Sequence, residues 1–554
     1  MLSKLIDTAM GRNIADTIIK NGIVFDVFNH TFQKKDVVIS NGKIVALGEY
    51  HLAKNIIDAT GKYVIPSFID AHAHIESSLL SPSEYAKMVI PKGVTTVIAD
   101  PHEITNVCGE NGLEFMFESA KSVPLDVKFM MPSCVPCTPF EHSGCVINGD
   151  LTKELLSKYD FLGLAEMMNF TGVINNDSDV LKKLSCGVFV DGHAPMLSGK
   201  ELCAYICGGI KTDHECSTSQ EALEKISLGM DILIREGTGA KNLEQLITSI
   251  TPYNLRHFAF CTDDKHINDI QNEGTILHCV KKAISCGVSL EDSLILATIN
   301  PASIYHLKDR GAIAPSYNAD ILICDKDLDN IFMVLKDGKI VAENGNPVFT
   351  TDSNLISKDL IEKVSNTVHI KEVSPNDFYL NFTPNMPVIE VNPNSLITNK
   401  IFPTSSEDLK LCAVIERHKA TGNIGKSFVK NIDIKNGAIA QTIGHDSHNI
   451  TVIGDNPNDM ALAVNSLTTV GGICIVQNGK ILSYMPLEIA GLMSNKPYEQ
   501  VLSKHLDIVK CAKEISKNGS STLLMLLSFL SLVVIPELKL NDSGLFDVLQ
   551  WKYL

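Results

Sequence analysis

The segment YVIPSFIDAHAHIESS (residues 63–78) is typical of a buried strand that ends in polar chemistry. Apolar and β-forming residues lead directly into Asp70, His72 and His74. Side chains two residues apart on a strand leave the same face, so the two imidazoles can converge on one cation. A lone His-x-His is weak evidence, because exposed histidine pairs are common. The remainder of the chain must therefore decide whether this is a metal site.

Polar residues recur where eight successive strand-like runs stop, at intervals of 21 to 33 residues. These residues are His74, His102, Ser133, Glu166, His193, His214, Glu236 and Asp263. Strands that alternate with amphipathic helices at this spacing predict an α/β protein built on a (β/α)8 TIM-like barrel, which keeps its active site at the carboxyl ends of the strands. Any single residue of this kind could equally cap a helix or bond a carbonyl. Seven histidines or carboxylates at one barrel mouth predict a metal site.

The barrel is predicted over residues 63–304. Residues 1–62 and 305–350 share a turn-strand pattern, NGKIVA and DGKIVA, and are predicted to pair into one small composite β-sandwich. Residues 351–385 mix Pro, Asn, Ser and charges and predict a linker. An additional C-terminal α+β domain is predicted over residues 386–554.

Composition narrows the class of protein. The formal net charge of −16 over 554 residues disfavours nucleic acid and anionic membranes as partners, which leaves a small-molecule substrate. The N-terminus lacks the pattern of a signal peptide, so a cytoplasmic location is expected, with the 15 cysteines as reduced thiols. The apolar run 522–535 is roughly 14 residues, too short to span a bilayer, and predicts a core element. We also predict a homo-oligomer.

Several blocks resemble a known family. DAHAH, the later histidines, the last strand-end aspartate and GAIAPSYNADILI resemble the metal-dependent amidohydrolase superfamily. Within it, HIESS, ADPHEITNVCG, GLAEMMNF, DGHAP, IREG, CTDDK, GHDSHN and LVVIPELKLNDSGLFDV are similar to the adenine deaminase family, and the similarity covers nearly the whole chain. The resemblance implies hydrolysis of adenine to hypoxanthine and ammonia by a metal-activated hydroxide, in purine salvage.

The resemblance also implies a binuclear metal centre. The implied ligands are His72, His74, Glu166, His193, His214 and Asp263. Glu166 would bridge the two metals at a position where many amidohydrolases have a carboxylated lysine. Nitrogen and oxygen ligands without thiolate suit manganese, iron or zinc, and the resemblance favours two manganese ions.

Deamination also needs proton carriers. Asp263 is predicted to accept a proton from water. For the general acid, Glu103 is the first candidate, Glu76 the second and Asp264 the third. Each of these three could equally be a carboxylate that orients a ligand imidazole.

Substrate contacts are predicted at other strand ends and in the C-terminal domain. Ser133, Arg235 and Glu236 lie where a ring would bind, although Arg235 and Glu236 could equally form an internal ion pair. His445 and Asp446 precede a β-forming run. They are either part of a solvated turn or part of a lid that reaches the active site, in the same chain or across a subunit boundary.

Two alternatives stay open at this point. One is hydrolysis of another cyclic amide, as in dihydropyrimidinases and hydantoinases. The other is a catalytically inactive amidohydrolase scaffold, although all six implied ligands are present. Within the adenine interpretation, the acidic charge and the absence of a Gly-rich phosphate loop favour the free base over a nucleotide.

Overall fold

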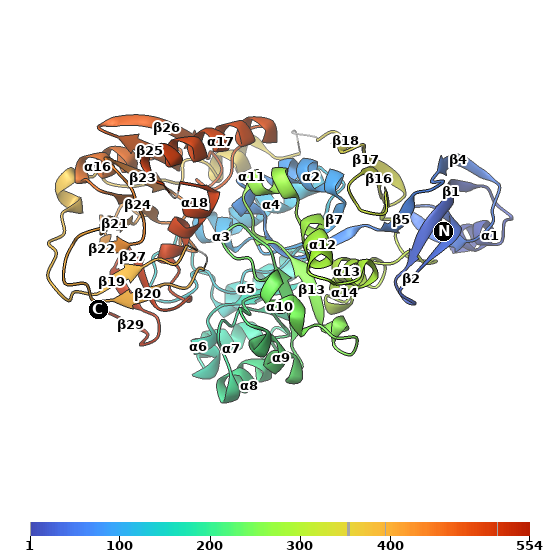
Figure 1. Cartoon of the computed structure of the whole chain (residues 1–554), viewed down its shortest axis with the longest axis horizontal. Helices are drawn as coiled ribbons and strands as arrows, with labels where there is room; N and C mark the ends of the chain where they lie inside the picture. Colours follow the sequence, from blue (N-terminus) through green and yellow to red (C-terminus); the bar gives the residue numbers. More distant parts are fainter. Residues whose placement is uncertain (1, 352–354, 394, 518) are drawn as a thin grey trace.

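The computed structural model describes residues 2–351, 355–393, 395–517 and 519–554. Figure 1 shows the barrel in the middle of an elongated molecule, with the N-terminal strands at one end and the C-terminal sheet at the other. The part of the chain that is described contains no helix of the length and apolarity that a membrane crossing requires.

Eight parallel strands form the barrel. They are β6 (Phe68–His74), β7 (Val94–Ala99), β8 (Asp126–Phe129), β9 (Gly163–Met167), β10 (Phe189–Gly192), β11 (Thr212–Asp213), β12 (Asp231–Arg235) and β13 (Phe258–Cys261). Parallel pairing follows chain order, with the bridges Met131–Leu164 and Val190–Ile210 joining β8 to β9 and β10 to β11. The short strand β14 (Asp263–Asp264) pairs with β6 and closes the ring. The predicted barrel is thereby confirmed.

Helices connect the barrel strands. They are α2 (Pro82–Val89), α3 (His102–Cys108), α4 (Glu110–Lys121), α5 (Gly149–Lys158), α6 (Phe170–Ile174), α7 (Ser178–Leu184), α8 (Gly199–Cys207), α9 (Ser219–Ser227), α10 (Leu243–Leu246), α11 (Ile267–Glu273), α12 (Ile276–Ser285), α13 (Leu290–Ala297) and α14 (Ile299–Ile304). Their starts follow from local sequence: Thr218, for example, accepts a hydrogen bond from the N–H of Glu221 and begins α9.

The two flanking segments form one continuous nine-stranded sheet. After α1 (Leu2–Ala9), the first segment supplies β1 (Ala15–Asp26), β2 (Thr31–Ser40), β3 (Lys43–Leu47), β4 (Ala53–Asp58) and β5 (Tyr63–Pro66). The second segment supplies β15 (Ile321–Cys324), β16 (Ile331–Lys336), β17 (Lys339–Glu343) and β18 (Asn346–Pro347). The segments join where β5 pairs antiparallel with β15. The predicted pairing is present, whereas the domain boundaries stay a prediction.

The run that leads into the histidines was predicted as one strand, and the structure divides it at Ser67. The Ser67 N–H donates to the carbonyl of Asp320 in the flanking region, whereas the next N–H, of Phe68, donates to the carbonyl of Gly93 in the barrel. Consecutive amides therefore bond to different sheets, so β5 ends and β6 begins within two residues.

The described part of the C-terminal region contains an eight-stranded sheet, a three-stranded sheet and three α-helices. The large sheet comprises β19 (Val388–Glu390), β20 (Asn399–Ile401), β21 (Lys410–Ile415), β22 (Ile424–Lys430), β23 (Gly437–Gln441), β24 (Ile450–Gly454), β25 (Gly472–Gln477) and β26 (Lys480–Pro486). The remaining elements are α16 (Pro457–Asn465), α17 (Tyr498–Ile515), α18 (Ser521–Ser528), β27 (Leu538–Asn541), β28 (Gly544–Asp547) and β29 (Lys552–Tyr553). The apolar run 522–535 is buried, as predicted.

The segment predicted as a linker contains α15 (Lys358–Lys363) and a 3-10 turn at Pro375–Phe378. Leu360 and Phe378 are buried, so the described part of this segment packs against its neighbours. Residues 352–354, which were included in that prediction, lie outside the described residues.

Asp213, directly before His214 in the sequence, forms a fully buried ion pair with Lys225. The Nζ of Lys225 donates to Asp213 at 2.9 Å, to Glu221 at 2.8 Å and to the carbonyl of Ala194 at 2.6 Å. Burial alone would raise the pKa of Asp213, but Lys225 lowers it to about 2. The carboxylate therefore stays charged at neutral pH and depends on this lysine.

We expect Lys225→Met to lower the free energy of unfolding by about 3–5 kcal/mol, because the substitution leaves a buried carboxylate unpaired. Urea unfolding followed by circular dichroism measures the change. Lys225→Met combined with Asp213→Asn should recover most of the loss, and Lys153→Met, at an exposed position of α5, should have no effect. An unchanged unfolding midpoint for Lys225→Met would show that the pair contributes nothing.

Candidate active site

The six predicted ligand residues converge at the carboxyl ends of the barrel strands, and all are buried. The Nε2 atom of His74 lies 3.1 Å from Nε2 of His72 and 3.1 Å from Oδ1 of Asp263. Glu166 lies between this group and the other two histidines. Its Oε1 is 3.4 Å from His74, while its Oε2 is 2.8 Å from Nδ1 of His193 and 3.2 Å from Nε2 of His214.

Short strands position these side chains. His72 and His74 leave the same face of β6, and His193 and His214 directly follow β10 and β11. Asp263 has a positive φ of 56°, an uncommon conformation for a residue with a side chain. Such a backbone persists only where the surrounding structure fixes it, and these positions concentrate at functional sites.

Further contacts hold the ligand residues in orientation. The Nδ1 atom of His74 lies 3.1 Å from the carbonyl of Asp100, and Nδ1 of His72 lies 3.4 Å from Asp191. Arg235 donates to the second carboxylate oxygen of Asp263 at 3.0 Å. These contacts use Nδ1 of both histidines and Oδ2 of Asp263. Both Nε2 atoms and Oδ1 of Asp263 therefore stay directed at one another.

This arrangement fits divalent cations. The Nε2 atoms of His72 and His74 and the Oδ1 atom of Asp263 converge on one point, and each can offer a lone pair to a cation. The ligand atoms of His72, His74 and Asp263 lie within 4.8 Å of one another, as do those of His72, Glu166 and His214. Buried imidazole and carboxylate groups at these spacings are the donors that zinc, manganese and iron prefer.

The candidate proton carriers have different environments. Glu103 contacts two histidines of the C-terminal domain, His445 through Nδ1 at 2.6 Å and His448 through Nε2. Asp264 accepts a hydrogen bond from the hydroxyl of Ser77. Glu76 accepts from the N–H of Ile104 at 3.2 Å, and burial together with the charge of Glu103 raises the pKa of Glu76 to about 7.

Two predicted substrate contacts do not join this cluster. Glu236 accepts hydrogen bonds from the N–H of Leu243 at 3.0 Å and from Lys282 at 3.1 Å, so its carboxylate turns outward toward the helices. Ser133 donates to the backbone carbonyl of Glu166 at 2.6 Å. The structure therefore gives Glu236 and Ser133 supporting positions and does not favour either as a substrate contact.

Arg235 forms the internal ion pair that was the alternative for this residue, but with a different partner. Its guanidinium donates hydrogen bonds to both carboxylate oxygens of Glu215, with Nη2 at 2.9 Å from Oε2. The same guanidinium also contacts Asp263. Arg235 thus links a metal-ligand candidate to Glu215, which follows His214 directly in the sequence.

A small cavity adjoins the cluster and is closed by the C-terminal domain of the same chain. Its lining includes Asp264 and Met168 from the barrel together with His445, Asp446 and Phe529. The ring of Phe529 stacks on His445, with centroids 4.2 Å apart and an interplanar angle of 21°. The predicted approach of His445 and Asp446 is therefore observed within a single chain.

Comparison with known proteins identifies the family. The amidohydrolase family model matches residues 63–238 and 234–344, and the adenine deaminase C-terminal domain model matches residues 390–552. The adenine deaminase of Clostridium acetobutylicum is 44% identical, covering 100% of both chains. Adenine deaminase 2 of Carboxydothermus hydrogenoformans is 41% identical, covering 99% of this chain and 98% of its own. The chain belongs to the adenine deaminase family. The predicted resemblance is confirmed.

For this member of the adenine deaminase family, sequence reasoning missed four residues of the site. Glu215 and Asp100 lie within two residues of histidines already singled out, and that proximity was an available signal. His448 lies in the same GHDSHN block as His445. Phe529 belongs to an apolar run that composition assigns to the core, so no sequence signal distinguished it.

Metal binding to this adenine deaminase family member should release protons. Burial alone would lower the pKa of His214, but Glu166 raises it to about 9. The metal-free imidazole is therefore protonated at neutral pH, and a cation must displace that proton. We expect affinity for Mn²⁺ to rise as pH increases from about 6.5, the ordinary histidine value, to about 9.

Titration calorimetry of Mn²⁺ into the metal-free protein, in buffers of different ionisation enthalpy at neutral pH, measures this release. We expect at least one proton per chain. Identical heats in every buffer would contradict the exchange of a proton for a cation.

Proposed function

We propose that this chain hydrolyses adenine to hypoxanthine and ammonia. The observation that carries the proposal is the full-length match to curated adenine deaminases, supported by a barrel mouth in which the six ligand candidates are all present and buried. A scaffold without activity would not need this set. A hydrolase of other cyclic amides would leave the match over the C-terminal domain unexplained. A cytoplasmic location, a homo-oligomeric state and independence from nucleic acid stay predictions.

We further infer that two divalent cations bind per chain, with manganese favoured. Four histidines and two carboxylates exceed what one tetrahedral site uses. His72, His74 and Asp263 would hold one cation, His193 and His214 the other, and Glu166 would bridge them. When bound, such a pair of cations would lower the pKa of water and so make hydroxide available near neutral pH.

The two protons of the attacking water must end on the purine and on ammonia. One goes to the ring nitrogen next to C6 and the other to the departing amine. Burial alone would raise the pKa of Asp263, but a hydrogen bond with His74 and the charges of His214 and Arg235 lower it well below its ordinary range. Asp263 is therefore an anion that can accept one proton and return it to the amine.

Glu103 is our choice for the second proton. Burial alone would raise its pKa, but the charges of His445 and His448 lower it well below the ordinary value. An ionised Glu103 can take a proton from water and pass it to the ring nitrogen. His445 and His448 would set the position and ionisation of Glu103, and this assigns the C-terminal domain a part in the reaction.

Asp446 extends the same contact between the domains. Its Oδ1 lies 3.6 Å from Nε2 of His102 and 3.7 Å from Nδ1 of His445. Burial alone would raise the pKa of Asp446, but His102 lowers it. We infer that Asp446 and His445 lie where the substrate ring binds and exclude water from it.

The first test is direct. Metal-free protein reconstituted with Mn²⁺ should convert adenine to hypoxanthine and ammonia, measured by chromatography of the purines and by ammonia release. Activity should reach its maximum at two equivalents of metal per chain, and Asp263→Asn should be inactive at the same metal loading. Full activity at one equivalent would exclude the binuclear centre. Failure to consume adenine would overturn the proposed function.

A second test addresses Glu103 and the C-terminal histidines. Glu103→Gln should lower kcat by about 10²–10⁴-fold with unchanged metal content, because the amide cannot carry a proton. His448→Ala removes a group that stabilises the Glu103 anion, so the pKa of Glu103 should rise and the acidic limb of the pH–kcat profile should move to higher pH.

His369→Ala is the control for this test, because His369 is an exposed histidine in the segment that precedes the C-terminal domain. Its pH–kcat profile should match that of the unaltered protein. If Glu103→Gln keeps its turnover, Glu76 or Asp264 is the proton carrier. If His448→Ala leaves the profile unchanged, the histidine does not act through Glu103.

A further inference from the structure

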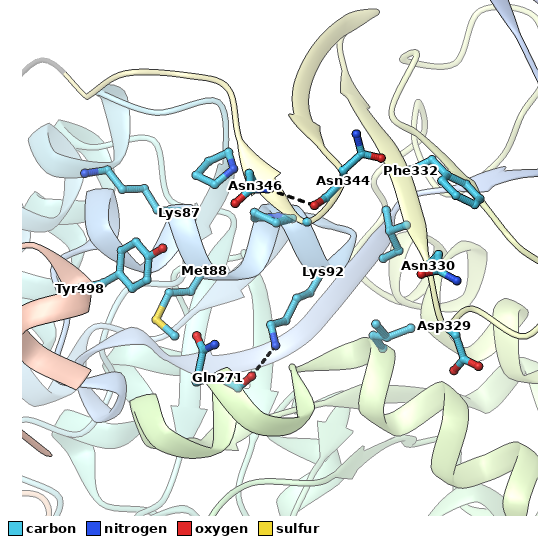
Figure 2. A pocket seen from close by; sticks show the side chains of 15 residues that line it. Lys87, Met88, Lys92, Gln271, Asp329, Asn330, Phe332, Asn344, Asn346 and Tyr498 are labelled. Carbon is cyan, nitrogen blue, oxygen red and sulfur yellow. Dashed lines mark hydrogen bonds between the residues drawn. The ribbon is translucent and has the colours of Figure 1, made fainter. Parts of the chain in front are cut away.

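Figure 2 shows a second cavity, which has a volume of about 580 Å³. Its walls come from three regions: the flanking sheet with Phe332 and Asn346, the barrel with Met88 and Lys92, and the start of α17 with Tyr498. None of its lining residues lines the cavity beside the histidines. The volume is in the range that holds small ligands.

The carboxylates at its edges are already paired. Glu84, next to the cavity, lies 2.6 Å from Nζ of Lys87. Asp329, on the opposite side, lies 2.8 Å from Nζ of Lys281. Neither acid is left to balance a further cation.

Lys92 lies in the cavity and, among the described residues, forms no ion pair. Its side chain is partly buried and extends across the cavity, where Nζ donates to the backbone carbonyl of Gln271 at 2.7 Å (Figure 2). Among the described residues, no carboxylate lies within 4 Å of that nitrogen. Burial and the nearby charge of Lys265 lower the pKa of Lys92, against the opposing charge of Glu273, which is itself paired with Lys265 at 2.6 Å. An ammonium group has three donors, so two remain for a ligand.

The remaining walls carry both polar and apolar side chains. The side chains of Asn344 and Asn346 lie above Lys92 in Figure 2, and the Tyr498 ring lies to one side. Met88 supplies an apolar contact on the side of Tyr498, and the ring of Phe332 lies at the opposite end of the cavity. The ammonium group of Lys62 lies 4.2 Å from the centroid of that ring, which adds a second positive charge near this wall.

We propose that this cavity binds a small organic anion, whose phosphate or carboxylate group pairs with Lys92 and whose apolar body packs against Met88. A charge-assisted hydrogen bond to a partly desolvated ammonium is stronger than a neutral one. The site is independent of the catalytic assignment, because it shares no residue with the metal cluster.

Titration calorimetry on the metal-loaded full chain tests this proposal with three probes: phenyl phosphate, benzoate and uncharged benzyl alcohol. We expect at least one charged probe to bind and benzyl alcohol not to bind. The comparison of phenyl phosphate with benzoate identifies the preferred anionic group. Lys92→Met should weaken binding by about tenfold or more, while Lys153→Met, at an exposed lysine elsewhere, should bind like the unaltered protein.

Asn346→Asp provides a second variant, because it places a negative charge at an exposed wall of the same cavity without removing a buried contact. It should weaken binding as Lys92→Met does, and it keeps the test valid if Lys92→Met does not fold. Adenine turnover should be unchanged in both variants. The proposal is overturned if no charged probe binds at about 10 mM, or if Asn346→Asp binds as tightly as the unaltered protein, since binding would then be elsewhere, such as at the metals.

Discussion

The dominant constraint on this structure is the burial of many charged and polar groups at one end of a barrel. Glu166 contacts three histidines, and Asp263 contacts His74 and Arg235. Ionised groups removed from water are unfavourable unless they are paired or bind a metal. The barrel supplies this pairing because eight parallel strands end at the same edge, so residues distant in sequence lie side by side. The contact of Asp100 with His74 and that of Ser133 with Glu166 keep those side chains in place.

Much of the barrel could be predicted, because it follows from periodicity, and the polar strand ends predicted a metal site at its mouth. The choice of the six ligand residues came from the family resemblance. Buried parallel strands appear in the sequence as apolar runs. A polar residue at the end of such a run lies at the mouth of the barrel. The outward turn of Glu236 could not be predicted in the same way. Arg235 and Glu236 are adjacent, and adjacent side chains of a strand leave opposite faces. Arg235 therefore reaches Asp263 while Glu236 meets Lys282, and the sequence alone does not indicate which of the two faces inward.

Contacts between domains were harder still to predict. His445 could be suspected from its block of polar residues, but its stacking on Phe529 depends on a run that is as apolar as any core helix. The division of one strand-like run at Ser67 was also not predictable. That run is shared between two sheets because consecutive amides donate to different acceptors. Local pattern determines which residues prefer a strand, but the acceptors available in the folded chain determine where that strand ends.

The loop that reaches Glu103 is fixed from within the C-terminal domain by Arg417. This fully buried guanidinium donates to the carbonyls of His448 and Ala490 and to the hydroxyl of Thr367. No carboxylate among the described residues lies within ion-pair distance, and burial lowers the pKa of Arg417 to about 10. A guanidinium that donates to two carbonyls and a hydroxyl from different segments can fix the backbone that it bridges. Because Arg417 holds the carbonyl of His448 while the imidazole of His448 contacts Glu103, the position of the barrel carboxylate depends on the packing of a separate domain.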